Sequence, residues 1–258
     1  MAKKSKPLIL VTNDDGITAP GIRNLVELMK PLGDVIIVAP DGAQSGMGHA
    51  ITISKPLRLD KIDLYGDIDA YQSSGTPVDC VKLAVDIVLH RKPDLLVSGI
   101  NHGSNSSINV IYSGTMSAAV EGAIEGIPSI GFSLCDYSYH ANFKPIAKYV
   151  TSIAKNVLEH GLPPGTLLNV NFPKVKSEAD IKGVRISRQC KAKWSENFEE
   201  RQDPNGRRYF WLTGKFVNND QGDDTDEWAL ANNYISVVPT QFDLTAYHSI
   251  PYLNDWKF

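Results

Sequence analysis

The sequence predicts an α/β fold built on a doubly wound, mostly parallel β-sheet. Short apolar runs alternate with segments of helical periodicity along the first two thirds of the chain, which is typical of a sheet with helices on its faces. The apolar runs are continuous rather than alternating with polar residues, as expected of parallel strands covered on both sides. The 258 residues, of which 42% are hydrophobic and 21% charged, suffice for one large domain or one domain with an appendage.

A βαβ unit opens the chain. The apolar, β-branched run Leu8 to Thr12 is predicted to be a strand, and Val35 to Ala39 is predicted to be the next one. Between them, Pro20 to Lys30 is predicted to be a helix, because apolar residues recur there at helical spacing. These residues are Ile22, Leu25, Val26 and Met29. A looser stretch follows, in which we expect short strands near Ile51 and Tyr71.

The alternation continues through the middle of the chain. Thr76 and Pro77 introduce a helix, and one face of that helix is apolar. The residues of this face are Val78, Val81, Val85 and Val88. The next predicted elements are a strand at Leu95 to Ser98, a loop from Gly99 to Ser113, a helix at Thr115 to Glu125, a strand at Ser129 to Ser133, a helix at Phe143 to Glu159 and a strand at Leu167 to Asn171.

The character of the sequence changes beyond Pro173. From Val184 to Val217, aromatic and β-branched residues flank the turn signal at 204–206, Pro-Asn-Gly, which predicts a protruding β-hairpin. Such an arm either meets a partner subunit or stands free in solvent, and the residues favour neither. A last strand is predicted at Ile235 to Val238. We therefore divide the chain into an α/β core at 1–175 and a β-rich arm and tail at 176–258.

Composition excludes several classes of protein. The formal net charge of −3 does not indicate a protein that binds nucleic acid or a membrane surface. Met1 to Lys6 is basic, but the apolar run that follows is too short for a signal peptide, and no apolar stretch is long enough to cross a membrane. We therefore expect a cytoplasmic protein. The three cysteines are widely spaced and have no C-x-x-C pattern, so we expect core thiols rather than disulfides or a zinc site.

Polar residues follow three of the predicted strands. Because ligands of open α/β sheets bind at the carboxyl ends of parallel strands, we expect these residues to converge. They are Asn13, Asp14, Asp15 and Gly16 after the first strand, Asp41, Gln44 and Ser45 after the second, and Gly99, Asn101, His102 and Asn105 after Leu95 to Ser98.

Two adjacent carboxylates at one strand end repel each other unless a cation lies between them. Oxygen ligands from Asp14, Asp15, Ser45 and Asn101 suit Mg²⁺ or Mn²⁺ better than zinc. We therefore predict one divalent metal ion per subunit, with waters completing its coordination. The alternative is that 13–16 is only a polar turn before the next helix; the two further strand ends that supply oxygen ligands argue against it.

A candidate anion site lies where the loop 99–113 meets the following helix. Ser113, Gly114 and Thr115 offer free backbone N–H groups at a helix N-terminus, which bind phosphate readily. Alternatively, Ser113 or Thr115 caps the helix, and the two roles are compatible. His49 and His102 lie in candidate site loops, but a loop histidine is more often a surface residue, so neither is assigned a catalytic role.

Three familiar motifs are absent from the sequence. It contains no G-x-x-x-x-G-K-[ST] phosphate loop, and Gly46 and Gly48 are not followed by the third glycine of a dinucleotide-binding loop. No serine lies in a G-x-S-x-G elbow. A dinucleotide enzyme and a serine-triad hydrolase are therefore disfavoured relative to metal chemistry.

Several motifs together resemble the SurE family. They are V-T-N-D-D-G at 11–16, A-P-D-x-x-x-S-x-x-x-H at 39–49, S-G-T-P-x-D-C at 74–80, S-G-I-N-x-G-x-N at 98–105, Y-S-G-T at 112–115, D-T-D at 224–226 and P-x-Q-F-D-L-T at 239–245. The resemblance spans the chain in order and spacing. Departures from the family pattern occur at Ser106 and Ser107, at Met116, and at Asn233, where a glycine is frequent.

The resemblance implies a Rossmann-like, metal-dependent 5′-nucleotidase, also acting on 3′-monophosphates and in some members on short polyphosphate. By motif, Asp14, Asp15, Ser45 and Asn101 match the metal ligands of the family. Positions that line its phosphate pocket match Asn13, Gly46, Asn105, Ser113, Gly114 and Thr115. The family assembles as homodimers or homotetramers through C-terminal arms, and we expect a swapped C-terminal tail.

The expected chemistry leaves one step open. A metal held by Asp14 and Asp15 would orient the phosphate, and the amides of 113–115 would receive the charge that develops on it. The attacking group is either a water or Asp14 itself, which would give an acyl phosphate. A nucleotide-binding regulator without turnover is the alternative function, but such a protein has no need for two carboxylates that repel the phosphate.

Overall fold

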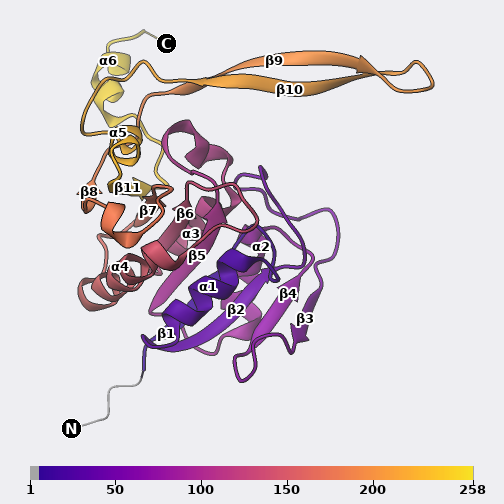
Figure 1. Cartoon of the computed structure of the whole chain (residues 1–258), viewed down its shortest axis with the longest axis vertical. Helices are drawn as coiled ribbons and strands as arrows, with labels where there is room; N and C mark the ends of the chain where they lie inside the picture. Colours follow the sequence, from indigo (N-terminus) through magenta and orange to yellow (C-terminus); the bar gives the residue numbers. More distant parts are fainter. Residues whose placement is uncertain (1–5, 258) are drawn as a thin grey trace.

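The computed structural model describes residues 6–257 and has a nine-stranded sheet at its centre. The strand order is β3-β4-β2-β1-β5-β6-β7-β11-β8, and helices lie on both faces of the sheet (Figure 1). The strands β4, β2, β1, β5, β6 and β7 run parallel to one another. The predicted α/β class, with a mostly parallel, doubly wound sheet, is therefore confirmed.

The elements follow the predicted alternation. The strands are β1 (Leu8–Thr12), β2 (Asp34–Pro40), β3 (Leu59–Ile62), β4 (Ala70–Ser73), β5 (Leu95–His102), β6 (Ser129–Leu134), β7 (Thr166–Phe172), β8 (Val184–Ile186), β9 (Lys193–Gln202), β10 (Arg208–Val217) and β11 (Ile235–Gln241). The α-helices are α1 (Pro20–Met29), α2 (Pro77–Leu83), α3 (Gly114–Ile124), α4 (Ala147–His160), α5 (Asp226–Ala231) and α6 (Ile250–Asn254). The remaining helical segments are the π-helical η1 (Ala84–Val88) and the 3-10 segments η2 (Ser107–Tyr112), η3 (Lys144–Ile146), η4 (Glu178–Asp180) and η5 (Tyr247–Ser249).

The core is divided by the sheet into two layers. Ile9 and Val11 of β1 pack into a cluster with α1 and α4, whereas Leu8 and Leu10 pack into a second cluster with α2 and α3. Side chains of successive strand residues point to opposite faces, so a continuous apolar run is what a strand covered on both sides requires. The apolar face of each helix supplies the matching stripe.

One strand prediction in the first half is wrong, and another strand is longer than predicted. No strand lies at Ile51, because the backbone there bonds to other loops and side chains: Thr76 Oγ1 donates to the Ala50 carbonyl at 2.7 Å, and Thr52 N–H donates to Asp79 Oδ1 at 3.0 Å. The edge strand is β3 instead. The strand predicted to end at Ser98 continues to His102, with a register shift between Ser98 and Asn101.

The region beyond Pro173 contributes two strands to the central sheet as well as forming the arm. β11 pairs with β7 in antiparallel fashion, and β8 pairs with β11 in parallel fashion. The sheet thus continues across the predicted boundary at residue 175. Val184 to Ile186 therefore belongs to the sheet edge, and the hairpin predicted from residue 184 starts only at β9.

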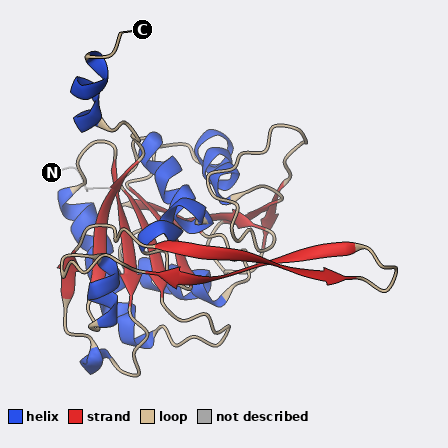
Figure 2. Ribbon diagram, turned by 90° about the horizontal axis from the view of Figure 1, so that it is seen from above, coloured by secondary structure: helices blue, strands red, loops and turns tan. Residues whose placement is uncertain are grey.

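The hairpin β9–β10 is a long arm that extends beyond the α/β body (Figures 1 and 2). Its turn lies between Gln202 and Arg208, as the Pro-Asn-Gly signal predicts. Aromatic side chains along it are exposed, among them Trp194, Phe198, Phe210 and Trp211. The C-terminal helix α6 also stands away from the body (Figure 2) and exposes Tyr252 and Leu253.

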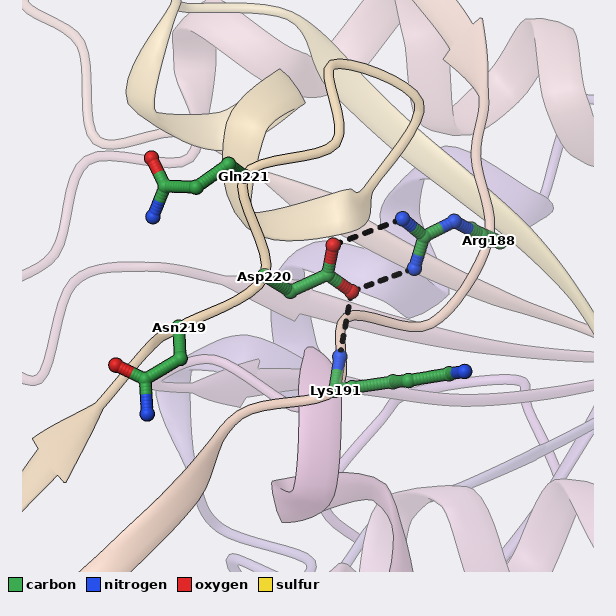
Figure 3. A pocket seen from close by; sticks show the side chains of 5 residues that line it. All are labelled: Arg188, Lys191, Asn219, Asp220 and Gln221. Atoms are coloured by element: carbon green, nitrogen blue, oxygen red, sulfur yellow. Dashed lines mark hydrogen bonds and ion pairs between the residues drawn. The ribbon is translucent and has the colours of Figure 1, made fainter.

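An ion pair fixes the base of the arm, where a pocket of about 620 Å³ opens. Arg188 binds both carboxylate oxygens of Asp220, at 2.6 and 2.9 Å, and the Lys191 N–H donates to the same carboxylate at 3.0 Å (Figure 3). Asp224 accepts a further bond from Arg188 at 2.9 Å. Residues 188–191 and 218–224, which flank the two arm strands, are thereby tied together.

Two predictions from composition can be checked against the described residues. Cys80 and Cys190 are buried, Cys135 is partly buried, and all three are free thiols. None of the helices within residues 6–257 combines the length and apolar character that a membrane crossing needs.

Candidate active site

The polar strand ends meet where the topology of the sheet reverses. From β1 the chain builds outward through β2 and β4 on one side, and from β5 it builds outward through β6 and β7 on the other. β1 and β5 are neighbours, with Thr12 opposite Ser98. The carboxyl ends of two such strands border the crevice in which open α/β sheets bind ligands.

Asp14 lies at the centre of this edge and is 5% exposed. Its Oδ1 accepts the hydroxyl hydrogen of Thr115, in the first turn of α3. Its carboxylate also lies directly against Gly114, where a β-carbon would come within 2.7 Å of the Asp14 Cβ. The N-terminus of α3, whose dipole favours negative charge, therefore faces the Asp14 carboxylate.

The two carboxyl groups have raised pKa values. Burial raises the pKa of Asp14 from 3.8 to about 6, and the charge of Asp15 adds to the rise. Burial also raises the pKa of Asp15. His102, whose backbone N–H donates to Asp15 Oδ2 at 3.4 Å, acts to lower that pKa but does not offset the burial. Within residues 6–257, neither carboxylate forms an ion pair with a lysine or arginine. This edge thus holds two close carboxyl groups without a cation of the protein beside them.

Asn13 presents an oxygen without a partner at the same edge. Its Nδ2 donates to the Gly16 carbonyl at 2.9 Å, while Oδ1 is buried and has no hydrogen bond among the described residues. Gly16 has a φ of +96°, which few other residues adopt. The turn 13–16 is therefore a tight polar turn that also contains a buried amide oxygen without a partner among the described residues.

The loop with Ser45 and Gly46 is anchored on both sides of its tip. The Gln44 N–H donates to the Asp14 carbonyl at 2.7 Å, and the Gly48 N–H donates to the Tyr112 carbonyl at 3.2 Å. Ser45 itself is exposed, and no hydrogen bond joins it to the carboxylates in the described structure. The anchors hold the loop between the end of β1 and the start of α3.

Asn101 lies inside β5 rather than in a loop, and Asn105 belongs to a buried amide network. Asn101 donates through Nδ2 to the Gly103 carbonyl at 3.0 Å. The Asn105 N–H donates to Asn171 Oδ1 at 2.8 Å, and its carbonyl accepts from Asn169 Nδ2 at 2.8 Å. Asn105 Nδ2 donates to Ser133 Oγ at 2.8 Å. Asn105 is thus tied to β6 and β7, which lie two and three strands from β1 in the sheet.

The start of α3 shows which of the two candidate residues caps the helix. Ser113 Oγ accepts from the Met116 N–H at 3.0 Å and is the N-cap of the helix. Thr115 does not cap the helix; its hydroxyl binds Asp14. The structure therefore brings Ser113, Gly114 and Thr115 to the carboxylates of the β1 end.

Sequence reasoning missed two groups beside this edge. The buried Glu121 of α3 binds His49 at 2.9 Å and also binds Lys82 of α2. The loop 135–142 after β6 lies over the end of β5, with the Ser138 carbonyl 2.8 Å from His102 Nδ1. Its position after a parallel strand is the same signal that identified the other three loops.

Residues 9–196 match the family model described as "Survival protein SurE". The chain belongs to the SurE family. It is 66% identical over 256 residues to a protein of Christiangramia forsetii named "5'-nucleotidase SurE", and 98% of each chain is covered. A protein of the same name from Flavobacterium johnsoniae is 64% identical over 256 residues, covering 99% of this chain and 98% of that one.

A solved SurE structure has the same fold. The crystal structure of the SurE protein from Aquifex aeolicus matches with a TM-score of 0.83 and 43% identity, over 96% of this chain and 100% of that one. Two of the departures from the family pattern coincide with unusual backbone. Ser107 and Asn233 have φ values of 53° and 63°. These values lie in the left-handed region, which glycine adopts without strain and which asparagine tolerates.

Proposed function

We propose that this chain is a metal-dependent 5′-nucleotidase that hydrolyses nucleoside 5′-monophosphates to nucleoside and phosphate. Relatives with 62–66% identity over nearly the whole chain carry that name. The observation that supports the activity most directly is the Asp14–Asp15 pair. It lies at the switch point of the sheet, beside a helix N-terminus and without a cation of the protein. A site of this kind attracts a metal ion and can then accept a phosphate.

We propose that Asp14, Asp15, Ser45 and Asn101 would hold one divalent ion, Mg²⁺ or Mn²⁺. The donors are all oxygen atoms, and the raised pKa of Asp14 reflects a buried charge that a cation would relieve. Once bound, such an ion supplies charge neutralisation and alignment for the phosphate. Ser45 lies at the exposed tip of an anchored loop, where its hydroxyl would be available to the ion.

The proposed phosphate pocket has backbone donors as its main feature. Gly46 and Gly114 lack side chains that would obstruct a phosphate, and α3 begins at Gly114, where the first N–H groups of a helix have no carbonyl partner within the helix. We assign the pocket to Asn13, Gly46, Asn105, Ser113, Gly114 and Thr115. Within this set, Thr115 acts on the phosphate through Asp14, since its hydroxyl is bonded to that carboxylate.

The burial of Asp14 favours water as the attacking group. One carboxylate oxygen accepts from Thr115, and the carboxylate packs against Gly114, so contacts with α3 hold the Asp14 carboxylate in place. An aspartate nucleophile must instead reach the phosphorus along the line of the breaking bond. Trapping a covalent phospho-enzyme with labelled substrate would contradict the water route.

Phosphate release from a panel of phosphomonoesters tests the function. The panel comprises nucleoside 5′- and 3′-monophosphates and short polyphosphate, each with Mg²⁺, Mn²⁺ or EDTA. We expect metal-dependent turnover of the 5′-monophosphates that is abolished in Asp14→Asn and retained in Asp63→Asn, a change at an exposed carboxylate. Binding of metal and nucleotide with no turnover of any substrate would favour the regulatory protein instead.

We propose a homodimer or homotetramer, built by the arm and tail within 176–258. Support comes from the exposed aromatic residues on β9, β10 and α6, because side chains of this kind are enriched in interfaces. Sedimentation is expected to show an oligomer, and replacing 194–216 by a short turn is expected to reduce its size. A monomer at working concentration would contradict this assembly. The cytoplasmic location stays a prediction, which cell fractionation tests.

A further inference from the structure

The loop between β6 and η3 covers the end of β5 beside the candidate site. It follows the next parallel strand along the sheet, so it lies at the same edge as Asp14 and Asp15. Two of its residues are large, aromatic and exposed: Tyr137 at 75% and Tyr139 at 69%. No function described above uses either side chain.

Both tyrosines are placed by contacts with the end of β5. The Tyr137 ring lies over Gly103, where a β-carbon would come within 2.4 Å of the ring. The Tyr139 ring stacks on His102, with centroids 6.5 Å apart and an angle of 15° between the planes. His102 in turn packs edge-on against the buried Phe143, with centroids 5.3 Å apart. Both aromatic rings are therefore held by packing contacts with the end of β5.

The same loop is connected directly to Asp15. His102 Nδ1 lies 2.8 Å from the Ser138 carbonyl, and because a carbonyl oxygen only accepts, Nδ1 carries the proton. The backbone N–H of His102 donates to Asp15 Oδ2. Asp136 accepts from Lys174 and from the Ser138 N–H, at 3.0 and 3.1 Å, which stiffens the turn. One short segment thus joins a carboxylate of the site to both rings.

A nucleotide that places its phosphate at Asp14 and Asp15 needs a surface for its base. Exposed aromatic rings are sequence-tolerant platforms for bases, because every base has a π-face. Among the described residues, no lysine or arginine lies over either ring; the contacts of Tyr139 are with the His102 ring, which stacks on it, and with the His140 ring, which packs edge-on. The surface therefore suits a flat, uncharged ring better than an anionic group.

We propose that Tyr137 and Tyr139 form a nucleobase platform that binds purines more tightly than pyrimidines. This inference rests on the proposed function, and it identifies the base as the part of the nucleotide that the two rings recognise. A purine covers more of a ring face than a pyrimidine does, so its stacking is stronger. The platform acts on substrate affinity and leaves the chemistry to the carboxylate edge.

The test compares AMP with ribose 5-phosphate, which has the same phosphate and sugar but no base. For Tyr137→Ala and Tyr139→Ala, the ratio of kcat/KM for AMP to kcat/KM for ribose 5-phosphate is expected to fall about tenfold. The fall is expected in KM, and it should be smaller with UMP than with AMP. Phenylalanine at either position keeps the ring and is expected to keep the ratio. Ile87→Ala, at a large apolar side chain of η1 that is 61% exposed and lies outside the arm and tail, is the control.

A second measurement does not depend on turnover. Adenosine binding, followed by calorimetry or saturation-transfer NMR, is expected to weaken in both alanine variants. An unchanged ratio together with unchanged adenosine affinity would overturn the platform, and so would an equal loss in the phenylalanine variants, since the ring is then irrelevant. Absence of phosphate release from AMP by the unaltered protein would instead overturn the proposed function, and adenosine binding would still test the platform.

Discussion

Thr115 donates its hydroxyl hydrogen to Asp14 Oδ1 across 101 residues of sequence. The bond joins the end of β1 to the first turn of α3, so the helix dipole and a hydroxyl both stabilise one buried carboxylate. This contact lowers the pKa of Asp14 against the rise that burial and Asp15 cause. The bond from Thr115 is therefore expected to favour the ionised form of Asp14, which is the form that binds a metal ion.

Replacing Thr115 by valine removes this hydroxyl and keeps the shape of the side chain. We expect metal affinity to fall about tenfold to a hundredfold, as is usual when a residue that orients a metal ligand is lost. Thr115→Ser retains the hydroxyl and is the control that should bind normally. The measurement is a Mn²⁺ titration followed by electron paramagnetic resonance. Equal Mn²⁺ affinity in the valine variant and the unaltered protein would refute the role.

Asp14→Asn is expected to stabilise the metal-free protein at neutral pH. The pKa of Asp14 is about 6 in the folded chain and 3.8 as an unperturbed group, so the folded state holds the proton more tightly. Stability from this residue is then present at low pH and is lost as the pH rises from about 4 to about 6. A shift of about two pKa units corresponds to about 3 kcal/mol, which is the largest gain expected from the neutral amide.

Urea unfolding in EDTA, repeated from pH 4 to pH 8, measures that gain. The difference between Asp14→Asn and the unaltered protein should be near zero at pH 4 and should reach a plateau above pH 6. Asp63→Asn, at an exposed carboxylate, should show no such curve. A constant difference at every pH would mean that the charge of Asp14 is not the cause.

Replacing Lys82 by methionine is expected to lower the free energy of unfolding of the protein, because Glu121 loses one of its two partners. The Glu121 side chain is 2% exposed and is bonded to both Lys82 and His49. Burial acts to raise its pKa, but these two bonds hold the pKa below the usual 4.5. Loss of one partner of a buried carboxylate costs about 1–3 kcal/mol; Lys82 is half-exposed, so we expect the lower end.

The pH dependence has the opposite sign to that of Asp14. A lowered pKa means that the stabilisation by Glu121 is present above about pH 4.5 and is lost as the pH falls below it. Lys82→Met should therefore match the unaltered protein at low pH and be less stable at pH 7. Lys30→Met breaks the exposed Lys30–Glu27 pair and should change stability by less than about 1 kcal/mol. Equal effects of the two variants would contradict the argument.

Asn171→Ala is expected to destabilise the fold and to loosen the loop with Asn105. Asn171 accepts the Asn105 N–H and donates to Asn169 Oδ1, both at 2.8 Å, in a buried network. An unsatisfied buried donor costs about 1–3 kcal/mol. Thermal unfolding and hydrogen exchange over 103–112 measure the two effects. Asn156→Ala, on the exposed side of α4, is the control, and an equal change in both would argue against the network.

The apolar pattern of the sequence determined most of the fold. Runs such as Leu8 to Thr12 are continuous because both faces of the sheet are covered, and that pattern is visible without a structure. The differences lie where tertiary contacts overrule the local pattern. The backbone on either side of Ile51 bonds to the side chains of Thr76 and Asp79 rather than to a strand, and β5 continues to His102 because β6 provides partners beyond Ser98.

The sequence by itself also determined which residues meet at the carboxyl edge, because a parallel sheet brings its strand ends together. It placed Asp14 and Asp15 at that edge from the strand ends, and it joined Ser113 to Thr115 to the same site through the family motifs. Only the tertiary structure decided that the Thr115 hydroxyl bonds to Asp14 and that Asn105 belongs to a buried amide network. It also decided that Tyr137 and Tyr139 contact the end of β5. The reason is physical: strand periodicity fixes the edge at which a residue lies, whereas side-chain partners depend on distances between segments far apart in the chain.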